Sequence, residues 1–470
     1  MTDDVIHRSM TDSQASPIAP VATAHTNTIL IVTDNVERAA DIKAQLINLK
    51  FRVNACMYDG KAKLDMPRDV PQIILIALTD YVEKAVSIAE EFKQHYEQPN
   101  LPIVGTFSRK ADIDTSAFES VIYPPAHPKQ IAIRVQSLVR LTLMEHEILR
   151  RTETLREHFG IHYELTEDAL LKPFKVLFVG KPTPEFMIII NSLQEKEIEV
   201  VAAFTTFNAF DYLYETQFDA VVMNALEDLE LPLTITSTMR RNAKLYHVPT
   251  LLLIDEETFD QEEHAFEKGA RDLIDANADI EEISGRILEL ANYHRIHSQL
   301  KHEFENLGGA ACIDQSSGTF NDTFFQQHLK RVCHDLQRAE MPISLIAIKV
   351  WPNASYAVSS QEFSSACAQV GTMLRNLVRM QDIAARLEND VYLIAFPYET
   401  QQTIQPVTER ISSIIDCAGF KTANENQGSF TVELSVSAVQ LGSNEESSSL
   451  INRALNGINI QTADVLKAVI

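Results

Sequence analysis

The sequence predicts an α/β protein of three domains, in which two doubly wound, flavodoxin-like parallel sheets precede an α+β domain. Three observations support this prediction. Apolar runs of strand length alternate with helical segments from residue 28, and the same alternation starts again at residue 175. Further along, two apolar runs flank a dipeptide that favours a tight hairpin turn. A chain of 470 residues has room for about three domains of ordinary size.

The composition is that of a strongly acidic globular protein. Its 65 acidic and 41 basic side chains give a formal charge of −24, which repels nucleic-acid phosphates and anionic lipid surfaces. The five cysteines are scattered and never form a C-x-x-C pair, so disulfides and a zinc site are not expected. No stretch approaches the roughly 20 apolar residues of a membrane helix. We therefore expect a cytoplasmic protein with no nucleic-acid partner, no membrane span and no bound metal.

The first alternation covers residues 27–140 and follows an N-terminal segment, residues 1–26, whose Ser, Thr, Ala and Pro content predicts disorder. Its predicted strands are continuously apolar, as is typical of strands buried on both faces of a sheet. They comprise residues 29–32, 72–78, 101–106 and 120–123. This segmentation, with Pro124 and Pro125 after the last strand, resembles a response-regulator receiver domain.

The phosphorylation chemistry of that family is not matched. The resemblance places a pair of Mg²⁺-binding acids at Thr33 and Asp34, and the phospho-accepting aspartate at Ala77. Phosphoryl transfer to a carboxylate needs the carboxylate, which alanine lacks. The first domain is therefore predicted to be a pseudo-receiver.

The second alternation, over residues 173–290, repeats the order of predicted strands and also resembles a receiver domain. The strands comprise residues 175–179, 218–224, 250–254 and 272–274. The phospho-acceptor position falls on Asn224, and Gly180 and Lys181 replace the acid pair. Asparagine keeps the shape of aspartate without its nucleophilic oxygen, so a second pseudo-receiver is expected.

Helical linkers are predicted after each alternation, over residues 141–172 and 291–312. Leu141, Ile148 and Leu155 recur at seven-residue spacing in the first linker, a pattern typical of helices that pair. Such a stripe could join two copies of the chain in a homodimer through the receivers and linkers. It could equally be an ordinary amphipathic helix that packs on its own domain.

The most informative stretch covers residues 379–396 and reads RMQDIAARLENDVYLIAF. Its two apolar runs flank Asn389 and Asp390, which tolerate positive φ angles, so a β-hairpin with a tight turn is predicted. Arg379 and Asp382 stand three residues apart in front of the hairpin. The stretch resembles the signature of the GGDEF, or diguanylate cyclase, family, in which R-x-x-D precedes a turn reading G-G-D/E-E-F.

The resemblance extends over the whole C-terminal domain, residues 313–470. Asp314, Gly318 and Asn321 match the D-x-L-T-G-L-x-N opening of the family. It implies an α+β, nucleotidyl-cyclase-like fold. Together with the two receiver-like alternations, the order is that of the PleD type of response regulator.

The residues that would carry cyclase chemistry are replaced. In place of the signature, the turn reads Glu388, Asn389, Asp390, Val391 and Tyr392. The resemblance also places a metal-binding aspartate where Lys349 stands. Because joining two GTP molecules needs metal ions to neutralise the triphosphates, we expect no catalytic residue, no Mg²⁺ and no enzymatic activity.

The residues of the family's inhibitory site are retained. The resemblance implies that Arg379, Asp382 and Arg410 bind an intercalated dimer of cyclic di-GMP. A guanidinium can donate to a guanine edge or a phosphate, and a carboxylate can accept guanine N–H groups. The alternative is a surface ion pair between Arg379 and Asp382 that contributes little. Arg386, in the strand before the turn, is expected to face solvent.

The sequence therefore predicts a catalytically inactive receptor for cyclic di-GMP in bacterial signal transduction, with no cofactor. Two alternatives stay open: a diguanylate cyclase of low activity, and a protein-docking scaffold that binds no nucleotide. A phosphorylation-driven regulator is disfavoured by Ala77 and Asn224. The eroded cyclase resembles the PopA type of alphaproteobacterial regulator, which implies cell-cycle control, a polar location and partners in adaptor and protease machinery.

Overall fold

The computed structural model describes residues 25–60, 64, 66–68, 70–97, 101–109, 113–123, 126–163, 172–307, 309–422 and 428–468, with side chains from residue 28 to residue 459. Most of the expected N-terminal lead-in, Pro124 and Pro125 lie outside the described residues. The chain divides into two compact units. We call residues 27–142 with residues 166–300 the N-terminal unit, and residues 143–165 with residues 301–470 the C-terminal unit.

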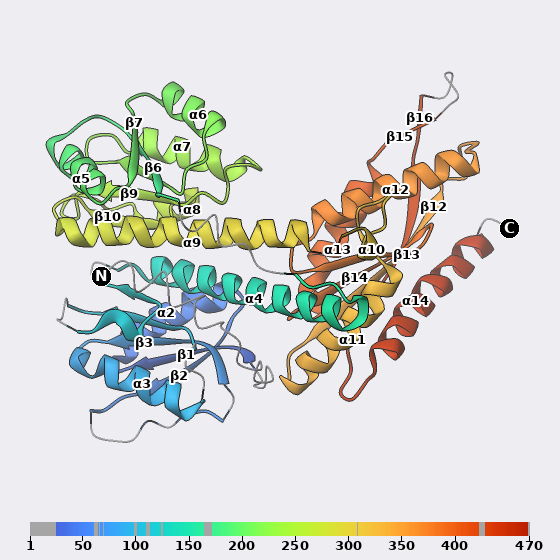
Figure 1. Ribbon diagram of the computed structural model, residues 1–470, viewed down its shortest axis with the longest axis horizontal. Coiled ribbons are helices and arrows are strands. Elements are labelled where there is room, and N and C mark those ends of the chain that lie inside the picture. The colour runs from blue at the N-terminus through green and yellow to red at the C-terminus, as the bar shows by residue number, and fades with distance from the viewer. Residues whose placement is uncertain are drawn as a thin grey trace. The chain divides into compact units, whose positions relative to one another are not determined.

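The first sheet of the N-terminal unit has the strand order β2-β1-β3-β4-β5, with parallel β1–β2, β3–β4 and β4–β5 pairs (Figure 1). Its strands are β1 (His25–Thr33), β2 (Arg52–Met57), β3 (Val70–Leu78), β4 (Ile103–Phe107) and β5 (Ser120–Ile122). Its helical elements are α2 (Val36–Asn48), η2 (Val82–Lys84), α3 (Ala85–His95) and η3 (Thr115–Ala117). The order 2-1-3-4-5 is that of the flavodoxin-like doubly wound fold.

The second sheet repeats this topology, with the order β10-β9-β8-β6-β7 and four parallel pairs. Its strands are β6 (Lys175–Val179), β7 (Glu199–Ala203), β8 (Ala220–Asn224), β9 (Thr250–Ile254) and β10 (Asp272–Asp275). Its helices are α5 (Pro184–Glu195), α6 (Thr206–Glu215), α7 (Glu230–Arg241) and α8 (Glu262–Lys268). The expectation of two doubly wound parallel sheets is confirmed, and their identity as receivers stays a prediction.

Burial on both faces explains why the strands are continuously apolar. In β6, Val176 and Phe178 belong to one hydrophobic cluster, whereas Leu177 and Val179 belong to another. Residues of α5 complete the first cluster, and residues of α6, α7 and α8 complete the second. A strand with helices on both sides buries every second residue on each face, so neither face can be polar.

The first part of each predicted linker continues the helix that follows the last strand of the preceding sheet. Helix α4 (Pro128–Phe159) has 32 residues and α9 (Ile280–Asn306) has 27. The expected linker starts, residues 141 and 291, therefore fall inside helices. Ile148 and Leu155 of the apolar stripe on α4 are 1% and 0% exposed in a single chain. A second copy is not needed to cover them, which favours the reading of an amphipathic helix packed within its own chain.

The C-terminal unit contains a mixed sheet in the order β11-β13-β14-β12-β17. Strand β12 pairs antiparallel with both β14 and β17, and β11 pairs parallel with β13. The strands are β11 (Phe320–Asn321), β12 (Ile343–Pro352), β13 (Ile383–Glu388), β14 (Val391–Pro397) and β17 (Val432–Gln440), beside a small pair, β15 (Phe420–Lys421) and β16 (Ser429–Phe430). The helices are α10 (Gly309–Cys312), α11 (Asp322–Arg338), α12 (Ser360–Leu377), α13 (Gln401–Asp416) and α14 (Ser447–Ala468). Among the helices of the described residues, none combines the length and apolar character needed to cross a bilayer.

Candidate functional site

The hairpin of β13 and β14 organises the candidate site. The two strands pair antiparallel, and Asn389 and Asp390 form the turn between them. The predicted hairpin is confirmed, and neither turn residue has φ above zero. A register shift between Arg386 and Glu388 marks an irregularity of β-bulge type. A bulge increases the local strand twist, so the turn does not need left-handed residues to match the strands.

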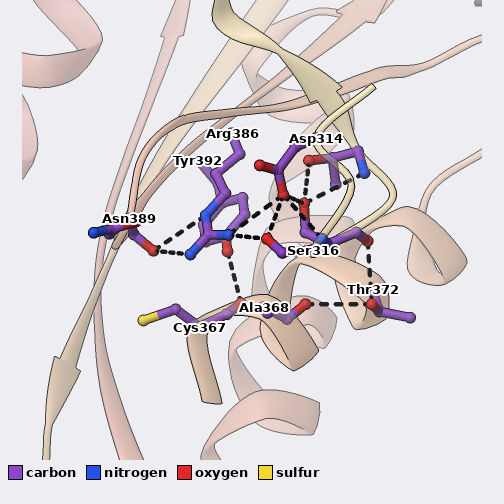
Figure 2. Close-up of polar contacts among 10 residues, drawn as sticks. Asp314, Ser316, Cys367, Ala368, Thr372, Arg386, Asn389 and Tyr392 are labelled. Carbon is purple, nitrogen blue, oxygen red and sulfur yellow. Dashed lines mark hydrogen bonds and ion pairs between the residues drawn. The ribbon is translucent and has the colours of Figure 1, made fainter. Parts of the chain in front are cut away.

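Arg386 is only 8% exposed. The prediction that it faces solvent is therefore wrong. Its guanidinium points toward both the turn and the loop that begins at Asp314 (Figure 2). Nη2 donates to the backbone carbonyl of Asn389 at 2.6 Å, and Nη1 lies 3.3 Å from Oδ1 of Asp314. Nη1 also donates to the hydroxyl of Ser316. The expectation was wrong because these polar partners satisfy the guanidinium inside the fold, which makes its burial tolerable.

Asp314 is the anionic centre of this network. Its Oδ1 accepts hydrogen bonds from Oγ of Ser316 at 2.6 Å, and from N and Oγ of Ser317 at 2.9 and 2.7 Å. Burial opposes ionisation, but the hydrogen bonds from Ser316 and Ser317, with Arg386, lower the pKa of Asp314 to about 2. The residue that matched the opening motif therefore anchors the turn as an ionised carboxylate.

Helix α12 packs directly against the same loop. A Cβ at Gly371 would lie 2.5 Å from Cβ of Ser317, so only glycine allows this approach. Thr372 donates from Oγ1 to the Ser317 carbonyl at 3.1 Å, and Tyr392 donates from its hydroxyl to the Cys367 carbonyl at 2.6 Å (Figure 2). The hairpin and α12 thus form one rigid support.

A cation lies beside the turn. Strand β12 places Lys349 opposite Val391, with Nζ 4.0 Å from Oδ2 of Asp390 and 4.4 Å from the ring centroid of Trp351. A Mg²⁺ ion needs near-octahedral oxygen ligands, and an ammonium next to the Asp390 carboxylate does not fit that ion. Across the part of the chain that the structure describes, no group of three or more His, Cys, Asp or Glu residues could hold a metal ion.

Arg379 and Asp382 lie in the short turn between α12 and β13. Oδ2 of Asp382 accepts the N–H of Arg379 at 2.8 Å, and the N–H of Asp382 donates to the Arg379 carbonyl at 3.0 Å. The Arg379 side chain is 64% exposed, and its Nη1 lies 2.7 Å from Oε1 of Glu399. The ion partner of Arg379 is therefore Glu399, a residue that no sequence motif had singled out.

The Asp382 carboxyl has a pKa near neutral pH. The residue is 7% exposed, and this burial raises its pKa to about 7, while Arg379 opposes the rise. A carboxylic acid with this pKa exchanges its proton near neutral pH. It can therefore either donate or accept a hydrogen bond there.

Arg410 joins the same location from α13. Its Nη2 donates to the backbone carbonyl of Leu377 at 2.9 Å, and Leu377 is the last residue of α12. Arg410 is exposed, as is Arg379 two residues beyond Leu377. The structure thus brings the three predicted site residues to one end of α12.

Arg151 of α4 supports this turn from inside. Its Nη2 donates to the carbonyls of Met380 and Asp382 at 3.0 and 3.2 Å, and its Nε donates to Oε1 of Glu147 at 2.8 Å. Burial raises the pKa of Glu147, but His328 and Arg151 lower it to about 2. Nothing in the sequence pointed to Arg151, because the helix pattern shows only its apolar stripe.

In the first sheet, the residue that the receiver resemblance assigns to the phospho-acceptor position is fully buried. Ala77 is 0% exposed within β3. The Asp34 carboxylate accepts the backbone N–H groups of Thr79, Asp80 and Tyr81 at 2.8, 2.7 and 3.0 Å. This carboxylate therefore fixes the loop that follows β3.

A guanidinium also lies at the carboxyl edge of this sheet, where ligands bind in doubly wound folds. Arg38 donates from Nη2 to Oγ1 of Thr106 at 2.8 Å and from Nη1 to the Leu78 carbonyl at 3.3 Å. Burial lowers the pKa of Arg38, and Asp34 opposes this effect. The Arg38 guanidinium is therefore a cation at the carboxyl edge of the first sheet.

Asn224 of the second sheet is fully used by local hydrogen bonds. Its Nδ2 donates to the Lys181 carbonyl at 2.8 Å, and its Oδ1 accepts the N–H of Leu226 at 3.1 Å. Gly180 allows the contact, since a Cβ there would lie 2.7 Å from Cβ of Asn224. The Lys181 ammonium lies 3.1 Å from Glu227. The Asn224 side-chain amide therefore links the end of β8 to the loop at Lys181.

Known proteins resemble both the C-terminal part and the full length of the chain. Residues 311–459 match the family model described as diguanylate cyclase, GGDEF domain. Over 452 residues the chain is 21% identical to the response regulator PleD of Caulobacter vibrioides strain NA1000 / CB15N, covering 94% of this chain and 98% of that protein.

Solved structures of GGDEF domains were also found. The FimX GGDEF domain from Pseudomonas aeruginosa is 16% identical and covers 32% of this chain and 93% of its own, with a TM-score of 0.29. The GGDEF domain of DgcB from Caulobacter crescentus, in complex with c-di-GMP, is 17% identical and covers 33% and 89%, with a TM-score of 0.28. The chain thus carries a GGDEF domain at its C-terminal end and is similar to a response regulator along nearly its whole length.

Proposed function

We propose that this protein is a non-catalytic receptor for cyclic di-GMP that binds the dinucleotide through Arg379, Asp382 and Arg410. One contrast within the C-terminal unit carries the proposal. At the hairpin turn, Lys349 and Val391 stand where the GGDEF resemblance places metal-binding acids. At the end of α12, the three inhibitory-site residues gather.

The gathered residues suit a ligand that combines guanine bases with phosphates. Arg379 presents an exposed guanidinium fork, which can donate two parallel hydrogen bonds to a phosphate or to the O6/N7 edge of guanine. Arg410 adds a second exposed guanidinium near the same helix end. Asp382, when ionised, can accept guanine N–H groups. Two cations and one acid at one place form a favourable surface for this dinucleotide.

Several features weigh against catalysis at the turn. The Lys349 ammonium beside Asp390 repels Mg²⁺, and Val391 offers no oxygen ligand. Without metal ions, the triphosphate charge of GTP has nothing to neutralise it. Glu388 and Asn389 place side chains where the family has glycines, which narrows the approach to the turn.

We also propose that neither flavodoxin-like sheet accepts a phosphoryl group. In the first sheet, Ala77 has no oxygen nucleophile and Asp34 is engaged with backbone N–H groups. In the second, Asn224 is engaged with the backbone at Lys181 and Leu226. The signal that the protein reads is then a bound ligand rather than a covalent mark.

Calorimetric titration of cyclic di-GMP into the full chain tests the proposal. We expect micromolar binding by the wild type, loss of binding in Arg379→Ala, and unchanged binding in Arg375→Ala. Arg375 is an exposed arginine one turn earlier on α12, so it controls for charge removal. Equal binding by Arg379→Ala and the wild type would overturn the site assignment, and the absence of binding by the wild type would overturn the function.

The alternatives give different results in two assays. A diguanylate cyclase of low activity would form the dinucleotide from GTP with Mg²⁺ or Mn²⁺, and we expect no product. A docking scaffold would bind no nucleotide in the titration. The resemblance to PopA-type regulators further leads us to propose protein partners at a cell pole, which co-purification from cells with and without the ligand would test.

A further inference from the structure

A pocket within the N-terminal unit is rich in basic side chains, although the chain has a net charge of −24. Helices α4 and α9 and the segments that lead into β9 and β10 form its walls. Six of the twelve lining residues are basic: Arg134, Arg140, Arg271, His247, His294 and His297. None of the twelve is acidic. The pocket therefore concentrates positive charge inside an otherwise acidic protein.

Arg271 is the central cation of this pocket. It is half-buried, and within the described part of the chain its guanidinium has no hydrogen-bond or ion-pair partner. Burial, together with the nearby guanidiniums of Arg240 and Arg140, lowers the pKa of Arg271 to about 9. A half-buried guanidinium beside two like charges is destabilised unless an anion joins it.

The fold holds these charges together instead of letting them separate. Arg240 donates from Nη1 to the Tyr246 carbonyl at 2.6 Å, which fixes its head group. Gly269 has a φ of 110°, and a Cβ there would collide with the Arg240 side chain. Glycine at this position therefore lets Arg240 lie close to the strand that follows Arg271. The backbone conformation at Gly269 therefore keeps the guanidiniums of Arg240 and Arg271 near each other despite their repulsion.

A third arginine of the pocket, Arg134, is neutralised by carboxylates. Arg134 lies 3.1 Å from Asp272 and 2.5 Å from Glu289. Asp272 is completely buried and also binds Arg286 at 2.5 Å. These two carboxylates are thus engaged on the Arg134 side, whereas no carboxylate lines the pocket beside Arg271.

We propose that this pocket binds a small phosphate-bearing anion, with Arg271 and Arg140 as its main ligands. Guanidinium forks match phosphate oxygens and hold them by charge-assisted hydrogen bonds. The rings of His247 and His297, whose centroids are 4.3 Å apart, add imidazole groups at the same wall. The site is separate from the Arg379 turn and does not depend on the function proposed above.

Titration of pyrophosphate and of inorganic phosphate into the full chain tests this site. We expect the wild type to bind pyrophosphate, Arg271→Gln to bind it about tenfold more weakly or not at all, and Arg241→Gln to bind it unchanged. Arg241 is exposed and follows Arg240 on the same helix, so it is the matched control. Arg379→Ala should bind pyrophosphate as the wild type does, which separates this site from the dinucleotide site.

Thermal unfolding provides a second measurement. Pyrophosphate should raise the melting temperature of the wild type and of Arg241→Gln but not that of Arg271→Gln. Without anion, Arg271→Gln should melt no lower than the wild type, because the substitution removes a repulsion. If Arg271→Gln does not fold, Arg140→Gln replaces it. Equal binding by Arg271→Gln and the wild type, or no binding by the wild type, would overturn the proposal, and tighter binding of GTP than of pyrophosphate would support it and identify a nucleotide as the source of the phosphate.

Discussion

The guanidinium of Arg151 on α4 donates to the backbone carbonyl of Asp382, 3.2 Å away. The same guanidinium contacts Glu147, so a buried ion pair in the helix holds the turn that presents Arg379. The candidate ligand site is therefore supported by a residue far from it in the sequence. Its geometry depends on α4 as well as on the GGDEF domain.

Replacing Arg151 should destabilise the C-terminal unit. Arg151→Met leaves the buried Glu147 carboxylate with one partner fewer, and breaking a buried pair in this way costs about 3 kcal/mol. Urea unfolding followed by the fluorescence of Trp351, the only tryptophan, reports on this unit alone. Arg156→Met, an exposed arginine on the same helix, should change stability by less than about 0.5 kcal/mol. Similar losses in both variants would contradict the role of Arg151.

Removing the charge of Glu399 should strengthen binding of cyclic di-GMP. The Glu399 carboxylate occupies the Arg379 guanidinium that the ligand would use. Because 64% of the Arg379 side chain is exposed, the pair contributes at most about 1 kcal/mol, and Glu399→Gln should raise affinity by up to about fivefold. Glu409→Gln on α13 is the control. Unchanged affinity in Glu399→Gln would show that the ion pair does not compete with the ligand.

Asp382 should give stability and ligand affinity opposite dependences on pH. Burial raises its folded-state pKa to about 7, above the ordinary value of 3.8, so the protonated form stabilises the fold. This contribution is complete below about pH 4 and is lost as the pH rises through about 7. Ligand binding through the carboxylate should instead tighten as the pH rises through about 7.

The difference between the wild type and Asp382→Asn isolates this effect. His328, whose pKa burial lowers, gives a stability slope of the opposite sign in both proteins and cancels in the difference. Urea unfolding and calorimetry over the range from about pH 5 to about pH 8 provide the two curves. Parallel curves for the wild type and Asp382→Asn would mean that Asp382 does not titrate there.

Arg386 should matter for folding and not for ligand binding. Arg386→Met removes the cation that joins Asp314 to the turn and leaves that partly exposed carboxylate without its ionic partner, at a cost of about 1–3 kcal/mol. The Trp351 unfolding curve measures the loss, with the exposed Arg375→Met as the control. A loss below about 1 kcal/mol would mean that the hydrogen bonds of Ser316 and Ser317 suffice to hold Asp314.

Restoring an acid at the second acceptor position should not restore phosphorylation. Asn224→Asp replaces the donor that faces the Lys181 carbonyl by a carboxylate, which should destabilise the fold by about 1–3 kcal/mol in scanning calorimetry. Mass spectrometry after incubation with acetyl phosphate and Mg²⁺ should find no phosphoryl group, since Gly180 and Lys181 supply no carboxylate for the metal. A phosphorylated aspartate at position 224 would contradict this prediction.

The sequence was sufficient for the elements whose pattern is local. The apolar runs of β6, β8 and β9 predict buried parallel strands because each residue must suit one of two covered faces. The hairpin around Asn389 and Asp390 was predicted for the same reason, since its flanking runs and turn residues are adjacent. The register shift between Arg386 and Glu388 was not predictable, because it depends on how the two strands pair.

The contacts that the sequence could not predict join distant segments. Arg386 contacts Asp314, which lies 72 residues earlier in the sequence. Arg151 donates to the carbonyl of Met380, which lies 229 residues later. No periodicity encodes such a pair, because the identity of one residue does not constrain the other until the fold places them together. Glu399 was missed for a related reason: it follows Tyr398, whose φ of 67° redirects the chain in a way that no motif indicates.

Asp34 ties the backbone of three successive residues after β3 to a single carboxylate. A loop held in this way is fixed in one conformation, whereas a protein segment that transmits a signal must move between at least two conformations. Under the function that we propose, the first sheet therefore keeps one conformation and does not respond to phosphate donors. In that proposal, the output of the protein follows the current concentration of cyclic di-GMP and carries no record of earlier kinase activity.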